Sequence, residues 1–214
     1  VFSHLSFKFE KNQRDRALSK REIKLLLDTC KENKNPNVYL SVYLAILTAG
    51  RAITVLNIQK RDIDIENNTI TLYNYKTSKK YKIGLNEKSV EWLKTKILPN
   101  YKNNEYLIRA VNENRRKNPP QPFRDVPKPV YKIMDELFNQ GLNKQDNSDR
   151  DNVVNFHTLR RSVATNLAKN GANLYNVMIL LNHSSIEQTM AYLNMTTEDL
   201  NNDIDIFLGN VFDE

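Results

Sequence analysis

Cysteine is nearly absent from this sequence, and so are other features on which common classes of protein depend. Cys30 is the only cysteine, so no disulfide can form within the chain and no cage of thiolates can bind a metal ion. No apolar run of about 18 residues and no secretory signal segment is present, so we expect a cytoplasmic protein without a membrane partner. The sequence also lacks a phosphate-binding glycine loop and any group of carboxylates with metal-ligand spacing. These absences direct attention to the basic and polar side chains.

Positive charge is in excess, with 32 Lys and Arg against 25 Asp and Glu and a net charge of +7. This balance is typical of proteins that bind nucleic acid, although a composition rich in lysine and asparagine produces it without that function. The 214 residues, of which 40% are hydrophobic, fit one domain or one domain with arms.

The first half of the chain contains two predicted helices, and an arginine follows the second of them. Residues 1–18 mix basic and aromatic side chains and are typical of an arm or linker. Ser19 and Glu22 form a capping box that predicts a helix to about Lys34. Residues 38–48 are apolar nearly all round, which predicts a helix buried in the core. Arg51 then follows a glycine, at the junction with a short helix over residues 52–59. A guanidinium held near the interior needs an anion, either in a structural ion pair or in a ligand.

Three short segments with alternating apolar residues follow, over residues 63–65, 70–73 and 81–85. They predict a three-stranded antiparallel sheet. The second turn of this sheet carries lysines, including Lys76 and Lys79. Such a turn is either a common charged hairpin tip or a place where a lysine faces an anionic substrate. The register of the hairpin cannot be fixed from one sequence.

The middle of the chain has fewer features. An amphipathic pattern predicts a helix over residues 85–98, ended by Pro99. Residues 99–125 lack periodicity and are interpreted as a long surface loop. A further helix is predicted over residues 126–140, and residues 143–152 are interpreted as a polar loop.

The most informative stretch is residues 155–194, where basic, imidazole and phenol side chains occur close together. His157 and Arg160 share one face of a helix that Gly171 ends, and its first turn favours an anion. A second helix over residues 174–181 leads to His183, and Ser185 is a candidate N-cap for a short helix with Tyr192. Two histidines, an arginine and a tyrosine within forty residues suggest phosphate chemistry.

This spacing resembles the catalytic box of the tyrosine recombinases, the integrase and Xer class. That family also has an arginine in a T-G-x-R sequence and a lysine in a β-hairpin. Leu47-Thr-Ala-Gly-Arg51 resembles the former, and Lys76 matches the latter best, with Lys79 as the alternative. Thr54 departs from the family pattern, because members usually carry an acidic residue three positions after the arginine. The resemblance implies an α+β fold over residues 19–196, mostly helical with a small three-stranded antiparallel sheet.

The resemblance also implies a reaction and a set of catalytic residues, namely Arg51, Lys76, His157, Arg160, His183 and Tyr192. The arginines would clamp a DNA phosphate with His183 as a further donor, and Tyr192 would attack it and lose its proton towards His157. Lys76 would protonate the departing 5′-oxygen. The 3′-phosphotyrosine keeps the energy of the broken bond, so the reaction would need no metal, ATP or other cofactor.

The expected partners follow from the same resemblance. They are double-stranded DNA and three further copies of the chain, in a tetramer on two DNA sites within the nucleoid. Residues 1–18 would link to a missing DNA-binding domain. Residues 197–214 predict a last helix that either packs on its own domain or docks on a neighbouring protomer.

Two other functions remain open from the sequence. A DNA-binding module that has lost cleavage would be consistent with Thr54, although Tyr192 and both arginines are present. A type IB topoisomerase uses a similar set of residues to relax supercoils. Chromosome-dimer resolution, phage integration and transposon movement would all use such a domain.

Overall fold

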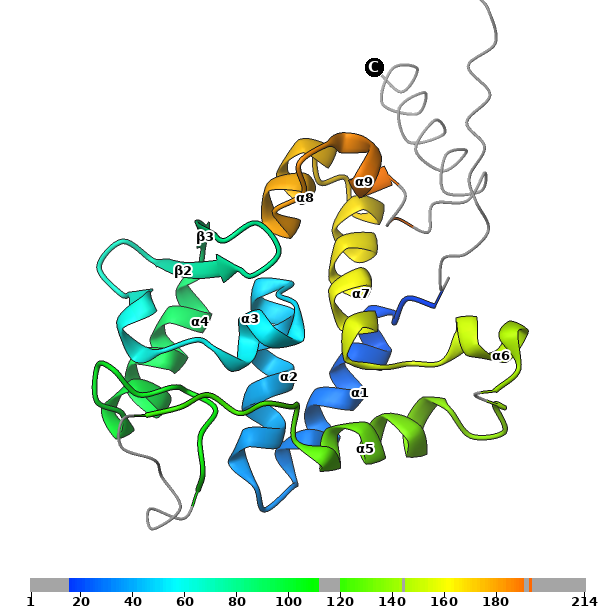
Figure 1. The fold of residues 1–214 in the computed structure, drawn as a ribbon, viewed down its shortest axis with the longest axis horizontal. Coiled ribbons are helices and arrows are strands. Elements are labelled where there is room, and N and C mark those ends of the chain that lie inside the picture. The colour runs from blue at the N-terminus through cyan, green and yellow to red at the C-terminus, as the bar shows by residue number, and fades with distance from the viewer. Residues whose placement is uncertain (1–15, 112–119, 144, 191–192, 194–214) are drawn as a thin grey trace, which may run out of the picture.

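The computed structural model describes residues 16–111, 120–143, 145–190 and 193, which form a mostly helical domain with one small sheet (Figure 1). Tyr192 and residues 1–15 and 194–214 lie outside the described residues. The helical elements, including short 3-10 (η1, η3) and π (η2) turns, are α1 (Lys20–Lys31), α2 (Pro36–Thr48), α3 (Ala52–Leu56), η1 (Lys60–Asp62), α4 (Glu87–Trp92), η2 (Leu93–Ile97), η3 (Leu98–Asn100), α5 (Lys128–Phe138), α6 (Asn147–Asn152), α7 (Phe156–Lys169), α8 (Leu174–Leu181) and α9 (Ile186–Met190).

The capping box predicted at Ser19 is confirmed. The Ser19 hydroxyl accepts from the Glu22 N–H, and the Glu22 carboxylate accepts from the Ser19 N–H. Helix α1 ends at Lys31 rather than near Lys34. Immediately before the helix, Leu18 is buried and its N–H donates to Ser162 Oγ on α7 at 2.7 Å. The start of the described chain is therefore attached to α7.

Helix α2 is the central element of the fold. It has buried residues around its whole circumference, as the apolar sequence predicted, and α1, α3, α5 and α7 pack against it. The main hydrophobic core lies around α2 and continues to the sheet and to α4. A smaller apolar cluster occupies the C-terminal part of the domain and consists of Ala49, Ala164, Ala168, Val177, Leu181 and Leu193. The two clusters meet at the C-terminal end of α2.

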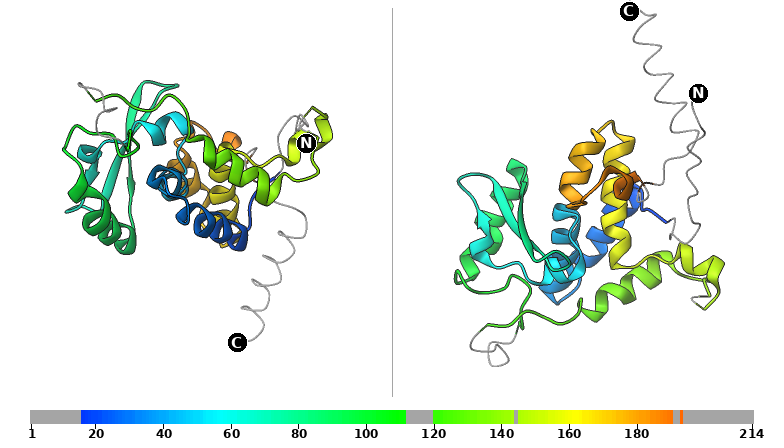
Figure 2. Two further views of the ribbon diagram at one scale, coloured as in Figure 1. Left: turned by 90° about the horizontal axis from the view of Figure 1, so that it is seen from below. Right: turned by 45° about the horizontal axis from the view of Figure 1, so that its top comes forward.

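The sheet is three-stranded and antiparallel, as predicted, with the order β1 (Ile63–Asp64), β2 (Thr69–Asn74) and β3 (Lys79–Gly84). In the β2–β3 hairpin, Ile70 pairs with Ile83 and Asn74 pairs with Lys79. The alternation of apolar residues buries one face of β2 against the core, because successive side chains of a strand point to opposite faces. Figure 2 shows the sheet and α4 at one end of the molecule and α5 and α6 at the other.

Other sequence predictions also differ from the structure. The short helix predicted over residues 52–59 is α3 and ends at Leu56. The helix predicted over residues 85–98 is α only to Trp92; it continues as the π turn η2 and then the 3-10 turn η3, which contains Pro99. Residues 143–152 are not all loop, because α6 lies within them. That helix has no apolar face, so hydrophobic periodicity could not reveal it. No helix among the described residues is long and apolar enough to cross a membrane.

Candidate active site

The N-terminus of α7 is capped as the sequence requires. The Asn155 side chain accepts hydrogen bonds from the N–H groups of His157 at 2.9 Å and Thr158 at 3.3 Å. In return, the Thr158 hydroxyl accepts from the Asn155 N–H at 3.0 Å. His157 is exposed in the first turn, whereas Arg160, one turn later, is only 1% exposed. The two side chains lie on one helix but at very different depths.

The guanidinium of Arg160 joins three segments of the chain. Its Nη1 donates to the Ala49 carbonyl at 2.7 Å, and its Nη2 donates to the Leu181 carbonyl at 2.5 Å. Nη2 also lies 3.2 Å from His183 Nε2. These three neutral acceptors together fix the orientation of the planar guanidinium in the interior.

The turn that supplies the Ala49 carbonyl is tightly built. Ala49 has a left-handed backbone conformation, with φ of 47°. A Cβ at Gly50 would lie 2.8 Å from Thr48 Oγ1 and 3.0 Å from Val55 Cγ2, so a larger residue would force this turn to shift. Arg51 then precedes α3 and is half-buried. The predicted position of Arg51, at the junction of a buried helix and a short one, is confirmed.

His183 lies beside Arg160, in the loop that follows α8. Asn182 ends α8 with φ of 46°, and His183 Nδ1 lies 3.1 Å from the Thr189 hydroxyl. Burial, followed by the positive charges of Arg160 and Arg51, lowers the pKa of His183 from 6.5 to about 4. The imidazole is therefore neutral at pH 7, and the hydrogen bonds assign the proton to Nδ1, because Nε2 accepts from Arg160.

This lowered pKa predicts how stability depends on pH. Between pH 6.5 and about 4, the unfolded chain binds a proton at this histidine that folded His183 does not bind. We therefore expect the free energy of unfolding to fall as the pH decreases through this window, and to be independent of His183 above it. Urea denaturation at a series of pH values measures the slope. His183→Gln should reduce the slope of unfolding free energy against pH by up to one proton. His157→Gln is the control, because His157 is exposed. Equal slopes in the unaltered chain and both variants would contradict the assignment.

The lysines lie in and beside the β2–β3 turn, whose backbone Asn74 shapes. Asn74 is buried, and its side-chain oxygen accepts from the N–H groups of Lys76 at 3.0 Å and Thr77 at 3.3 Å. The side chains of Lys76 and Lys79 are exposed. The structure thus brings two arginines and His183 together, with Lys76 in the exposed β2–β3 turn and Lys79 at the start of β3.

Thr54, at the position where the family carries an acidic residue, is buried and bonded to the sheet. Its hydroxyl donates to the Tyr73 carbonyl on β2 at 3.1 Å. Tyr73 immediately precedes Asn74, which shapes the lysine turn. Thr54 therefore connects α3, the helix that follows Arg51, to the hairpin through a neutral hydrogen bond.

Tyr81 is a residue of this region that the sequence did not identify. Burial raises its pKa, while the charges of Arg160 and Arg51 act in the opposite direction, so the phenol lies near both arginines. The alternating pattern over residues 81–85 predicted the strand but carried no sign of the arginines. The proximity of Tyr81 to Arg51 and Arg160 depends on long-range packing of the chain.

The remaining predicted residue, Tyr192, falls outside the described residues. Its described neighbours bracket the position: α9 ends at Met190, and the Leu193 N–H donates to the Met190 carbonyl at 3.1 Å. Leu193 packs in the smaller apolar cluster with Leu181. Among the described residues, no group of three or more His, Cys, Asp or Glu could hold a metal ion.

Comparison with known proteins gives a consistent result. The model of the phage integrase family matches residues 16–199. A probable integrase/recombinase of Acholeplasma phage L2 is 28% identical over 162 residues, covering 75% of this chain and 50% of that protein. The tyrosine recombinase XerA of Thermococcus onnurineus is 26% identical over 187 residues, covering 86% of this chain and 60% of that one. The chain thus spans about half to three fifths of these relatives.

A likeness in fold accompanies the likeness in sequence. A solved structure of the Tn1549 transposon integrase in complex with a circular intermediate DNA superposes with a TM-score of 0.65 at 18% identity. The match covers 92% of this chain and 67% of that chain. The mostly helical architecture with its small antiparallel sheet is shared.

Proposed function

Because this chain belongs to the phage integrase family of tyrosine recombinases, we propose that it cleaves and rejoins DNA strands at specific sites through a 3′-phosphotyrosyl intermediate. The observation that carries this proposal is the buried Arg160 guanidinium, held by two carbonyls beside neutral His183 and near Arg51. A cationic group fixed before the substrate arrives, with a second one nearby, is suited to a phosphodiester whose negative charge grows in the transition state.

In the proposed mechanism, Arg51 and Arg160 hold the non-bridging oxygens of the scissile phosphate. The Tyr192 oxygen attacks the phosphorus, and the bond to the 5′-oxygen breaks. The phenol proton leaves towards His157, which is exposed in the first turn of α7. The attacking strand end of a second DNA later reverses the step and releases Tyr192. One phosphodiester is exchanged for another through a phosphotyrosine, so the bond energy is conserved and neither ATP nor a metal ion is required.

His183 has two functions in this proposal. In the absence of DNA it accepts a hydrogen bond from Arg160 and keeps the guanidinium in place. Its pKa of about 4 keeps it neutral at physiological pH. A bound phosphate would provide a stronger acceptor for Arg160, and His183, in the tautomer with its proton on Nε2, would then donate a further hydrogen bond to the phosphate.

Lys76 is proposed as the general acid that protonates the 5′-oxygen. Lys76 lies in the turn whose backbone is held by the Asn74 side chain. The Thr54–Tyr73 hydrogen bond attaches the preceding strand to α3. The backbone of the turn is thus positioned, although the lysine side chain is exposed. Approach of the DNA backbone to the hairpin would bring lysine and phosphate together. Lys79, which pairs with Asn74 at the start of β3, is the alternative.

A leaving group that needs no proton can distinguish the two lysines. We expect Lys76→Ala to slow cleavage of an ordinary duplex by about 10²-fold or more, as for loss of a general acid. Cleavage of a duplex with sulfur in place of the 5′-bridging oxygen should be unaffected, because a thiolate leaves without protonation. Lys79→Ala is the matched control on the same turn. If Lys79→Ala shows the sulfur rescue and Lys76→Ala does not, the roles are reversed.

The proposed partners are double-stranded DNA and copies of this chain. The Tn1549 integrase structure contains DNA, which supports DNA as the substrate here. A tetramer on two DNA sites would allow strand exchange. Residues 197–214, outside the described residues, are proposed to dock on a neighbouring protomer.

The proposed function is tested by trapping the covalent intermediate. Full-length protein is incubated with nicked duplexes tiled from its native genomic surroundings, without added metal or ATP, and analysed on a denaturing gel. A slowly migrating protein–DNA band establishes a strand transferase and locates its site. Tight, salt-sensitive binding with no adduct on any bound duplex would instead indicate a module without cleavage activity.

A further inference from the structure

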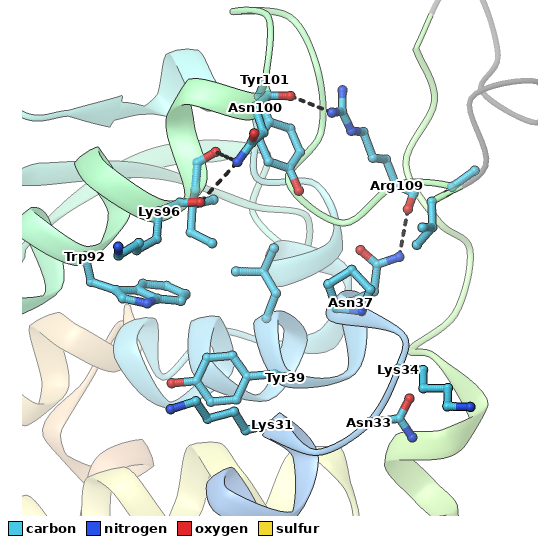
Figure 3. A pocket seen from close by; sticks show the side chains of 15 residues that line it. Lys31, Asn33, Lys34, Asn37, Tyr39, Trp92, Lys96, Asn100, Tyr101 and Arg109 are labelled. Atoms are coloured by element: carbon cyan, nitrogen blue, oxygen red, sulfur yellow. Dashed lines mark hydrogen bonds between the residues drawn. The ribbon is translucent and has the colours of Figure 1, made fainter.

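A second functional feature lies at the other end of α2 from Arg160. A pocket of about 670 Å³ opens between the α1–α2 turn, η2, η3 and the segment over residues 100–111 (Figure 3). This volume is within the range of roughly 300–1,000 Å³ that small-molecule sites occupy. The first turn of α2 lines the pocket, whereas Ala49, just past the end of α2, contacts Arg160. At a rise of about 1.5 Å per residue, these two places are roughly 18 Å apart.

The rim of the pocket is basic. Lys31, Lys34 and Lys96 line it with exposed side chains, and in the described part of the chain none of the three forms an ion pair. Arg109 is also present but is already engaged: it pairs with Glu105, donates to the Asn100 carbonyl at 2.6 Å and lies 4.0 Å from the centre of the Tyr101 ring. No carboxylate belongs to the described side chains that line the pocket. The three lysines are therefore available to a negatively charged group.

The walls offer aromatic and apolar surface. Trp92 and Tyr39 stand on one side with their ring centroids 5.8 Å apart, and Tyr101 stands on another (Figure 3). Leu40 and Ile97 provide apolar contacts between them. A flat ring could stack here, because every nucleobase has a face that aromatic side chains can cover.

One polar atom that faces the pocket has no hydrogen-bond partner among the described residues. Asn37 is only 3% exposed, and its Nδ2 donates to the Arg109 carbonyl at 2.7 Å, which fixes the orientation of the amide. Its Oδ1 points into the pocket (Figure 3) and accepts no hydrogen bond from any described residue. Because the amide is held in place while this oxygen is open to the pocket, it can accept a hydrogen bond from an N–H donor of a ligand. The lysines of the rim supply no such directional acceptor.

We propose that this pocket binds a nucleoside phosphate whose base carries an amino group. The base would stack against the aromatic walls, its amino group would donate to Asn37 Oδ1, and the phosphate would lie between the rim lysines. The proposal uses none of the residues assigned to DNA cleavage and is independent of that function.

The sequence supplies a reporter for this site, because Trp92 is the only tryptophan. The intact chain is titrated with AMP while Trp92 fluorescence is followed, and calorimetry checks the binding curve. We expect a saturable change with AMP and about tenfold weaker binding of IMP, which has no amino group to donate to Asn37.

Lys34→Glu should weaken AMP binding by about tenfold or more, since it places a negative charge beside the phosphate. Lys132→Glu, on an exposed face of α5, is the control and should bind AMP as the unaltered chain does.

Results of three kinds would overturn the proposal. The first is the absence of saturation with AMP at millimolar concentration. The second is equal binding of AMP and IMP, or AMP binding that Lys34→Glu leaves unchanged. The third is a saturable change with a synthetic peptide of residues 197–214 but none with AMP, which would identify the pocket as a docking site for an acidic segment.

Discussion

Tyr192→Phe is expected to abolish the covalent protein–DNA adduct while leaving DNA binding within a few-fold of the unaltered chain. The substitution removes one oxygen atom, the nucleophile of the proposed reaction, and retains the ring. No other side chain can substitute for it, because the phosphate clamp fixes the direction of attack. The adduct band on a denaturing gel measures cleavage, and a mobility shift on the same duplex measures binding.

The matched control for this variant is Tyr175→Phe. Tyr175 is 57% exposed on α8, at the opposite end of that helix from Leu181, so its loss of a hydroxyl should leave both cleavage and binding unchanged. Survival of the adduct in Tyr192→Phe would refute the proposed nucleophile. Loss of the adduct in both variants would indicate a general effect on folding instead.

Arg160→Lys is expected to reduce the rate of adduct formation by about 10³-fold, comparable to the removal of a transition-state hydrogen-bond donor in other enzymes. Lysine keeps the charge but presents a single ammonium, which cannot reach the Ala49 carbonyl, the Leu181 carbonyl and a phosphate together. Single-turnover rates on a saturating concentration of the target duplex measure the effect.

The same substitution should also lower stability, and this must be measured separately. Loss of hydrogen bonds from a charged donor to two buried carbonyls costs about 1–3 kcal/mol of unfolding free energy. Urea denaturation gives this value, and rates are compared at temperatures where both proteins remain folded. Arg21→Lys, on the exposed surface of α1, is the control. An Arg160→Lys rate within tenfold of the unaltered chain would remove Arg160 from the catalytic set.

Local features of this fold were predictable from the sequence because they depend on neighbouring residues. The capping box at Ser19, the hairpin between β2 and β3 and the left-handed Asn182 after α8 all follow from short-range rules. The bounds of α8 were predicted correctly as well, at Leu174 and Leu181. The sequence order and these elements together were enough to place Arg51 at a helix junction and Arg160 near the start of α7.

Long-range contacts were not predictable. The hydrogen bond from Arg160 to Ala49 joins residues 111 positions apart, and nothing in either local sequence specifies it. The approach of Tyr81 to the two arginines has the same origin. Helix α6 was missed for a different reason, since it is stabilised by polar contacts, including the Asn143 N–H bonded to Asp149 at 2.8 Å.

The choice of main-chain carbonyls as acceptors for Arg160 has an evolutionary consequence. A carbonyl oxygen is present whatever side chain its residue carries, so positions 49 and 181 can change identity without losing their bond to the guanidinium. Only their packing and the backbone path restrict them. Pairwise covariation across homologues would therefore show no partner for Arg160 at these two positions, although they hold it most closely in space. Arg160 would be invariant, whereas the residues at positions 49 and 181 would vary among homologues.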